Sequence, residues 1–94
     1  MKISEFQQLI RDLYFAKDNG RGLDATFLWF VEEVGELSRA LKRGTAQEQA
    51  EEFADVLAWL TTMASIQGID LEAVAKAKYE HGCPKCGHTP CDCG

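Results

Sequence analysis

The sequence predicts an all-α protein in which four helices form one domain over residues 1–82 and a small cysteine-rich tail covers residues 83–94. Apolar residues recur at spacings of three and four, which is the period of an amphipathic helix. Residues that cap or end helices stand between these periodic segments. No segment alternates apolar and polar residues as a half-buried strand does. Together these observations favour a helical bundle.

The first helix is predicted from a capping box and the turn that follows it. Ser4, with Gln7 three residues later, matches a capping box, in which side chains satisfy free backbone N–H groups. The apolar stripe after it fades near Lys17. Residues 18–22, Asp-Asn-Gly-Arg-Gly, are typical of a turn. We therefore expect the first helix to end near Lys17.

The second and third helices are predicted to form an antiparallel hairpin. Asp24 or Thr26 can cap the second helix, and Gly44 ends it. Thr45 with Glu48 forms a capping box for the third helix directly after this glycine. Because the connection is so short, the two helices should lie side by side.

The fourth helix should follow the third after another short turn. Gly68 closes the third helix, and Asp70 caps the fourth. The fourth helix must finish by Gly82 because Pro84 follows. The second and third helices are apolar over more than one face, which four short helices cannot cover. We therefore expect a homodimer, or a dimer of dimers, to complete the bundle.

Composition and charge limit the classes of partner. Of the 94 residues, 46% are hydrophobic and 27% charged, as in a globular domain. The formal net charge of −5 opposes a nucleic-acid polymer as partner, because phosphate backbones attract clustered positive charge. The longest uncharged stretch, residues 56–69, is shorter than the roughly 20 residues that a membrane helix needs. The charged start lacks a signal-peptide core, so we expect a cytoplasmic protein without a membrane partner.

Acidic residues on the second and third helices form the candidate catalytic site: Glu32, Glu33, Glu36, Glu52 and Asp55. Acids three residues apart share one side of a helix. In a hairpin that turns at Gly44, residues equidistant from the turn face each other. Glu36 should therefore face Glu52, and Glu33 should face Asp55. Such carboxylates suit Mg²⁺ or Mn²⁺. A solvated acidic face is the alternative, and the pairing across a hairpin disfavours it.

The string Glu32-Glu33-x-x-Glu36, then fifteen residues, then Glu52-x-x-Asp55 resembles the motif of MazG-type nucleotide pyrophosphohydrolases in the all-α NTP pyrophosphatase superfamily. The resemblance covers roughly residues 3–82. It implies Mg²⁺-dependent hydrolysis of a nucleoside triphosphate to the monophosphate and pyrophosphate. It also implies four metal ligands, which are Glu33, Glu36, Glu52 and Asp55. Glu32 would bind a second ion or orient water.

The resemblance implies one substrate-binding residue, Lys78, and the aromatic character of Trp29 makes it a second candidate. Lys78 stands at the family's spacing from the start of the last helix to a phosphate-binding lysine, and it shares a face with Leu71 and Val74. A surface lysine is the alternative. Trp29 and Trp59 could stack on the base, although aromatic residues at helical spacing also pack in cores.

The tail holds all the cysteines of the chain, which are Cys83, Cys86, Cys91 and Cys93. A Cys-x-x-Cys turn followed by glycine has the form of a zinc knuckle, and the second pair can complete a Cys₄ site. His81 or His88 could replace one thiolate. The alternatives are an oxidised or flexible tail and an iron–sulfur cluster. Zinc is the ion that we expect.

Two functions of different classes follow from the sequence. The leading hypothesis is an enzyme that removes unwanted or excess nucleoside triphosphates. The alternative is a non-catalytic, metal-dependent interaction module whose tail docks a partner. Release of pyrophosphate from a nucleoside triphosphate in the presence of Mg²⁺ separates the two hypotheses.

Overall fold

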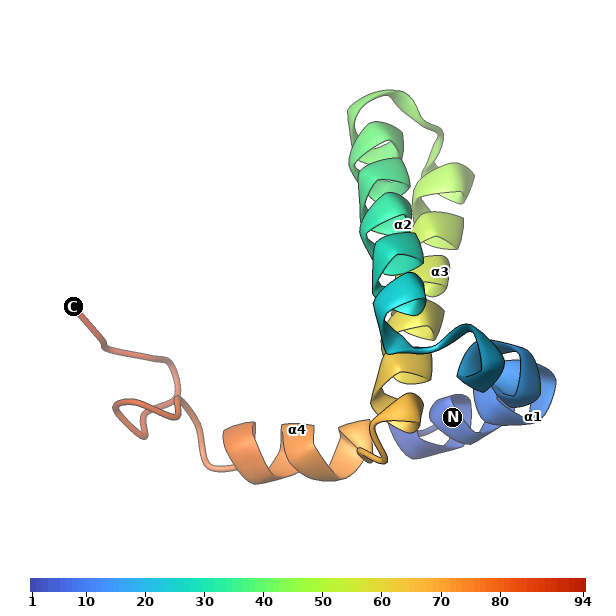
Figure 1. Ribbon diagram of the computed structural model, residues 1–94. Helices are drawn as coiled ribbons and strands as arrows, with labels where there is room; N and C mark the ends of the chain where they lie inside the picture. The colour runs from blue at the N-terminus through green and yellow to red at the C-terminus, as the bar shows by residue number, and fades with distance from the viewer.

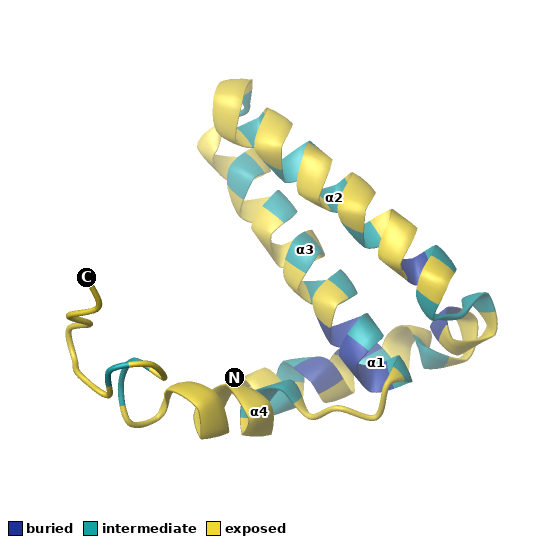
Figure 2. Ribbon diagram, turned by 60° about the vertical axis from the view of Figure 1, so that its left-hand side comes forward, coloured by how far each residue is buried: buried dark blue, intermediate teal, exposed yellow.

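The computed structural model describes residues 1–94 and consists of four helices without a strand (Figure 1). The helices are α1 (Ile3–Arg21), α2 (Leu23–Arg43), α3 (Ala46–Ile66) and α4 (Leu71–Tyr79). Helices α2 and α3 form a long antiparallel hairpin, and α1 crosses its base. Helix α4 leaves the base and carries the tail away from the hairpin (Figures 1 and 2). The all-α prediction is confirmed. None of the helices is both long and apolar enough to cross a bilayer.

The turn between α2 and α3 forms as its residues predict. The N–H of Gly44 donates to the carbonyl oxygen of Ala40 at 2.7 Å, and a Cβ at Gly44 would lie 2.8 Å from that oxygen. Thr45 accepts from the Glu48 N–H at 3.1 Å, and the Glu48 carboxylate accepts from the Thr45 N–H at 2.9 Å. The capping box therefore starts α3 at once, and the side chain of Asp70 caps α4 in a similar way.

The predicted start of α1 is wrong. The helix begins at Ile3, and the N–H of Lys2 donates to the carboxylate of Glu5 at 2.8 Å. Ser4 and Gln7 therefore lie inside the helix and form no capping box. Gln7 fails to cap because its side chain is buried against another part of the chain.

Gln7 ties α1 to the turn between α3 and α4. Its amide nitrogen donates to the Ser65 hydroxyl at 3.1 Å and to the Ile69 carbonyl at 2.8 Å. Its amide oxygen accepts from the backbone N–H of Leu71 at 3.0 Å. One buried side chain therefore satisfies backbone groups at the end of α3 and at the start of α4.

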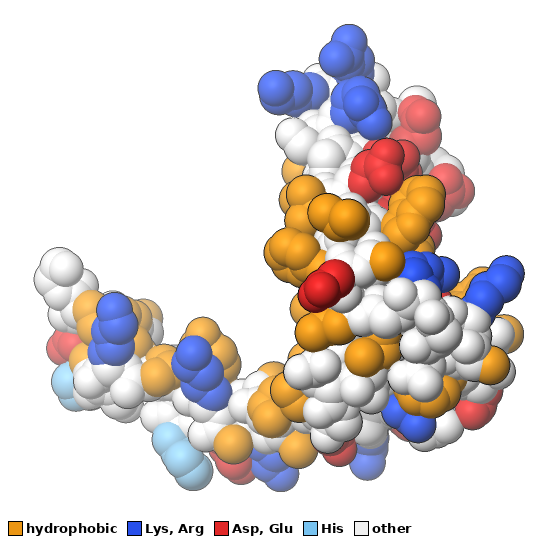
Figure 3. All heavy atoms as spheres, in the orientation of Figure 1, with side chains coloured by type: hydrophobic (Ala, Val, Ile, Leu, Met, Phe, Trp, Pro, Cys, Tyr) orange, Lys and Arg blue, Asp and Glu red, His pale blue; other side chains and the backbone are white.

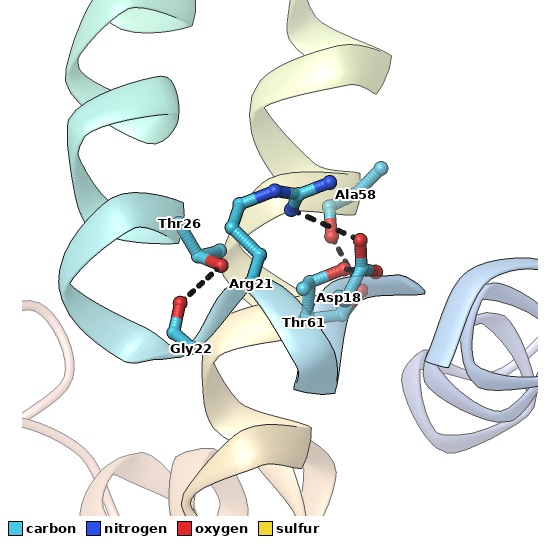
Figure 4. Close-up of polar contacts among 7 residues, drawn as sticks. Asp18, Arg21, Gly22, Thr26, Ala58 and Thr61 are labelled. Carbon is cyan, nitrogen blue, oxygen red and sulfur yellow. Dashed lines mark hydrogen bonds and ion pairs between the residues drawn. The ribbon is translucent and has the colours of Figure 1, made fainter. Parts of the chain in front are cut away.

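The predicted end of α1 is also wrong, because the helix continues past Lys17 to Arg21. Residues 18–22 were expected to form a turn, but Asp18 is buried against α3. Its carboxylate accepts from the Thr62 hydroxyl at 3.1 Å. It also accepts from the Arg21 guanidinium at 3.0 Å (Figure 4). The bond with Thr62 of α3 and the ion pair with Arg21 within α1 stabilise the helical conformation over residues that favour a turn locally.

A single glycine connects α1 to α2. Gly22 has φ 88°, a conformation that other residues rarely adopt, and α2 begins at Leu23. Neither Asp24 nor Thr26 caps α2, so that prediction is wrong. The buried Thr26 hydroxyl donates instead to the Gly22 carbonyl at 2.7 Å (Figure 4).

The single chain has almost no apolar core. Ile10 and Ala64 are the only buried hydrophobic residues. Much of the ribbon of α2 and α3 is coloured as exposed in Figure 2. The exposed residues of this hairpin include the large apolar residues Phe27, Leu28, Val31, Val34, Leu41, Phe53, Leu57 and Leu60. A monomeric protein rarely leaves so much apolar surface in water.

Replacing Gln7 with Ala should destabilise the chain, because it leaves the Ile69 carbonyl and the Leu71 N–H without partners. We expect the free energy of unfolding to fall by about 1–3 kcal/mol. Gln8→Ala is the matched control, since Gln8 bonds only with Asp12 on the surface, and it should change stability by less than about 0.5 kcal/mol. Urea denaturation at one protein concentration measures both. Equal losses in the two variants would contradict the role of Gln7.

Candidate functional site

Three glutamates meet at the seam between α2 and α3. Carboxylate oxygens of Glu33 and Glu36 on α2 and of Glu52 on α3 lie within 4.8 Å of one another, and all three residues are half-buried. The hairpin turn at Gly44 aligns the two helices so that these residues come together. In Figure 3 acidic side chains lie below the basic tip of the hairpin and beside hydrophobic side chains.

Two of these oxygens are buried without a hydrogen-bond partner, Oε2 of Glu33 and Oε2 of Glu52. A buried carboxylate oxygen without a donor carries an uncompensated desolvation cost. The two orphaned oxygens come from different helices, so a single cation at the seam could compensate both. This donor set consists of hard oxygen ligands, which fits Mg²⁺ or Mn²⁺.

The electrostatics of the seam oppose ionisation. Desolvation raises the pKa of Glu33, and the neighbouring charges of Glu36, Asp55 and Glu52 raise it further. Desolvation also raises the pKa of Glu52, followed by the charges of Glu36 and Asp55, while Arg39 acts in the opposite direction. A cation bound at the cluster would act in the opposite direction and favour the ionised carboxylates.

Asp55 and Glu32 lie outside this triad. Asp55 is exposed, but its charge acts on both Glu33 and Glu52. It lines a groove of about 460 Å³ between α1 and α3, whose wall also includes Lys17, Arg21 and Trp59. Glu32 is exposed on α2.

Trp29 contacts the aromatic residue opposite it. The rings of Trp29 and Trp59 stack with centroids 6.3 Å apart and planes 13° from parallel. The Arg21 guanidinium lies 5.1 Å from the Trp59 ring, which places a cation beside the aromatic pair. Trp29 remains 49% exposed, so part of its surface is free to contact another molecule.

The sequence analysis missed several charged residues around the seam. Arg39 and Arg43 line a hollow of about 370 Å³ together with Glu36 and Glu52. Their spacing of three and seven residues from Glu36 was a usable signal, because it puts them on the same side of α2. Arg21 was missed because its segment was expected to be a turn.

Within one chain, Lys78 does not lie near the carboxylates of Glu33, Glu36 and Glu52. It is exposed on α4, where its ammonium lies 5.7 Å from the Tyr79 ring. Helix α4 packs on α1 and points away from the hairpin (Figures 1 and 2).

The cysteines of the tail form a second cluster. The four Sγ atoms lie within 4.8 Å of one another, and all four cysteines are free thiols. Backbone N–H groups of Cys86 and Lys85 donate to Cys83 and lower the pKa of its thiol to about 6. The neighbouring thiols of Cys91, Cys83 and Cys86 raise the pKa of Cys93 to about 11. Four sulfur atoms this close together could hold a zinc ion, which binds cysteines as thiolates.

Comparison with protein-family profiles matches residues 21–87 to the MazG nucleotide pyrophosphohydrolase domain. The match covers more than half of the chain and includes every candidate acidic residue. Comparison with curated proteins gives no match.

The raised pKa values of Glu33 and Glu52 predict that their contribution to the stability of the metal-free protein falls as the pH rises. A carboxyl whose pKa is higher in the folded state binds its proton more tightly there, so its contribution is present below the unfolded value of 4.5. That contribution is lost as the pH rises through the folded pKa. In the presence of a chelator, Glu33→Gln should therefore lose less stability than the wild type as the pH rises. We expect its Tm to be a few degrees higher near neutral pH.

Glu48→Gln is the control of opposite sign. Hydrogen bonds from Thr45 lower the pKa of Glu48, so its contribution is lost as the pH falls. Thermal unfolding of the wild type and both variants, followed from acidic to neutral pH, gives Tm as a function of pH for each protein. Identical pH profiles for the wild type and Glu33→Gln would contradict the buried, repelling cluster.

Proposed function

The chain belongs to the MazG nucleotide pyrophosphohydrolase domain family, and on this premise we propose that it hydrolyses a nucleoside triphosphate to the monophosphate and pyrophosphate with Mg²⁺ or Mn²⁺. The observation that carries the proposal is the pair of orphaned oxygens of Glu33 and Glu52 beside Glu36. These acids come from two helices and meet at one point, as a site for a cation bound to phosphate requires.

The proposed metal ligands are Glu33, Glu36, Glu52 and Asp55. The first three already lie together, and Asp55 is close enough for its charge to raise the pKa of Glu33 and Glu52. Members of this family use a divalent metal. When bound, such an ion supplies charge neutralisation on the phosphates and a lowered pKa for water.

The reaction is attack of water on the α-phosphorus. A bond forms between the water oxygen and the α-phosphorus, and the bond from the α-phosphorus to the bridging oxygen breaks, so that pyrophosphate leaves. Glu32, which is exposed and outside the triad, would accept the proton from the water. Trp29 would contact the base with the half of its surface that is exposed.

We further propose that residues 1–82 are the catalytic domain and that residues 83–94 are a separate tail that binds zinc. The acidic seam and the tail lie at different ends of the molecule (Figure 1). Each holds its own cluster of potential metal ligands, oxygens in one and sulfurs in the other. Hard and soft donors select different ions, which supports two independent metal sites.

The functional unit would be a homodimer, or a dimer of dimers. A second copy of the chain would cover the apolar side chains exposed along α2 and α3. Lys78 points away from the carboxylates of its own chain, so it would bind the outer phosphates at a site of a neighbouring copy.

Glu36→Gln and Asp55→Asn should each lower kcat/KM by about 100-fold or more, because each removes a proposed metal ligand. Glu51→Gln is the matched control, since it removes the same charge from the exposed position next to Glu52 and should keep most activity. Chromatographic analysis of the products should give monophosphate and pyrophosphate. Formation of diphosphate and orthophosphate, or full turnover by both variants, would refute the assignment.

Lys78→Met should lower kcat/KM by about 10-fold or more, because a charge-assisted contact with phosphate is lost. Lys76→Met, two residues earlier in α4 and also exposed, is the control and should stay active. If Lys78 acts on a neighbouring copy, an equal mixture of Lys78→Met and Glu36→Gln chains should regain about one quarter of wild-type activity. Activity no higher than the average of the two variants, or a well-folded monomer in sedimentation at micromolar concentration, would contradict this arrangement.

A further inference from the structure

Residues 83–94 fold around their own sulfur atoms. The N–H of Gly87 donates to the Cys83 carbonyl at 2.7 Å, which closes the Cys-Pro-Lys-Cys turn. The N–H of Cys83 donates back to the His88 carbonyl at 3.1 Å. Gly82 has φ 103°, and a Cβ there would lie 2.8 Å from the Thr89 hydroxyl oxygen. The tail therefore has one defined, tightly closed conformation.

The sulfur spacing matches the edges of a tetrahedron around one ion. The Sγ atoms of Cys83 and Cys93 lie 3.7 Å apart, and those of Cys86 and Cys91 lie 4.0 Å apart. Zinc–sulfur bonds of about 2.3 Å in a regular tetrahedron require sulfur–sulfur edges of about 3.8 Å. No pair of the four exceeds 4.8 Å. The Cys93 N–H also donates to the Cys91 sulfur at 3.4 Å, a bond that stabilises a thiolate.

Resting on the zinc-binding tail proposed above, we propose that this tail holds one Zn²⁺ in a mononuclear, four-coordinate site made only of thiolates. Its ligands are Cys83, Cys86, Cys91 and Cys93. Four protein ligands leave no open position, so the site is structural rather than catalytic. The ordering of residues 83–94, which contain no helix or strand, then depends on the metal.

One of the two histidines that the sequence offers as substitute ligands, His88, contacts another residue of the tail. His88 Nδ1 lies 2.9 Å from the Asp92 carboxylate, with both side chains exposed. Cys86, His88 and Asp92 form a smaller group of potential ligands, but a metal there would leave three thiols unused. His88 Nδ1 therefore has a local polar partner outside the thiolate tetrahedron.

Neither a disulfide nor an iron–sulfur cluster fits these positions. A disulfide needs sulfurs about 2.05 Å apart, well below the shortest pair here. In a cluster the four thiolates bind different irons, which lie on separate corners, so the sulfurs are spread more widely than around one ion. The compact spacing is that of a single metal ion.

Metal analysis of the full-length chain tests the site. The chain, purified without a metal-binding tag, should contain about one zinc and no iron. Replacing zinc with Co²⁺ should produce the thiolate charge-transfer bands and the intense visible absorption of tetrahedral cobalt. The four thiols should react with a thiol reagent only after a chelator removes the metal. Iron in place of zinc, or four reactive thiols before chelation, would overturn the proposal.

Single substitutions in the tail distinguish residues that bind zinc from neighbouring polar residues that do not. Cys86→Ser and Cys91→Ser should each lose zinc on dialysis, whereas His88→Ala, the matched control within the tail, should keep about one ion per chain. Helical circular dichroism should stay close to that of the wild type in all three, because the helices lie outside the tail. Zinc loss in His88→Ala, or zinc retention in both cysteine variants, would overturn the all-thiolate site.

Discussion

Three carboxylates meet between α2 and α3, and two of their oxygens are removed from water without a donor. Such a cluster opposes the approach of the helices that carry it, because the charges repel and the desolvation is uncompensated. Other contacts must therefore hold the hairpin closed. The turn at Gly44 and the capping box of Thr45 and Glu48 fix one end. Helix α1 packs across the other end.

Polar side chains provide much of what fixes α1 to α3. Gln7 and Asp18 are buried about three turns apart on α1, and each bonds to a hydroxyl of α3, Ser65 and Thr62 respectively. Buried hydrogen bonds of this kind are directional and select one docking angle. That angle forms the groove beside Asp55 and leaves the apolar sides of the hairpin open. In a single chain, hydrogen bonds therefore fix the position of α1 on α3, while the apolar sides of α2 and α3 remain exposed.

The features that could be predicted from the sequence are those that neighbouring residues and the geometry of a helix determine. The hairpin turn, the cap at Asp70 and the approach of Glu36 to Glu52 all follow from nearby residues and from the period of the helix. The prediction failed at Gln7 and Asp18, whose partners lie 58 and 44 residues away and override local turn and capping preferences. The position of Lys78 relative to the carboxylates could not be predicted either, because it depends on the direction in which α4 leaves the base of the hairpin.

The one-residue joint at Gly22 restricts how the length of this chain can vary. An α-helix turns by about 100° per residue, so an insertion or deletion at the joint would rotate α1 against α2. Gln7 and Asp18 would then face away from Ser65 and Thr62. Length changes are therefore incompatible with the fold at this point, even where the added residue suits a helix. Between the end of α4 and Gly82, where the chain leaves the other helices, the same change alters neither the helix packing nor the spacing of the sulfurs, so variation in length belongs there.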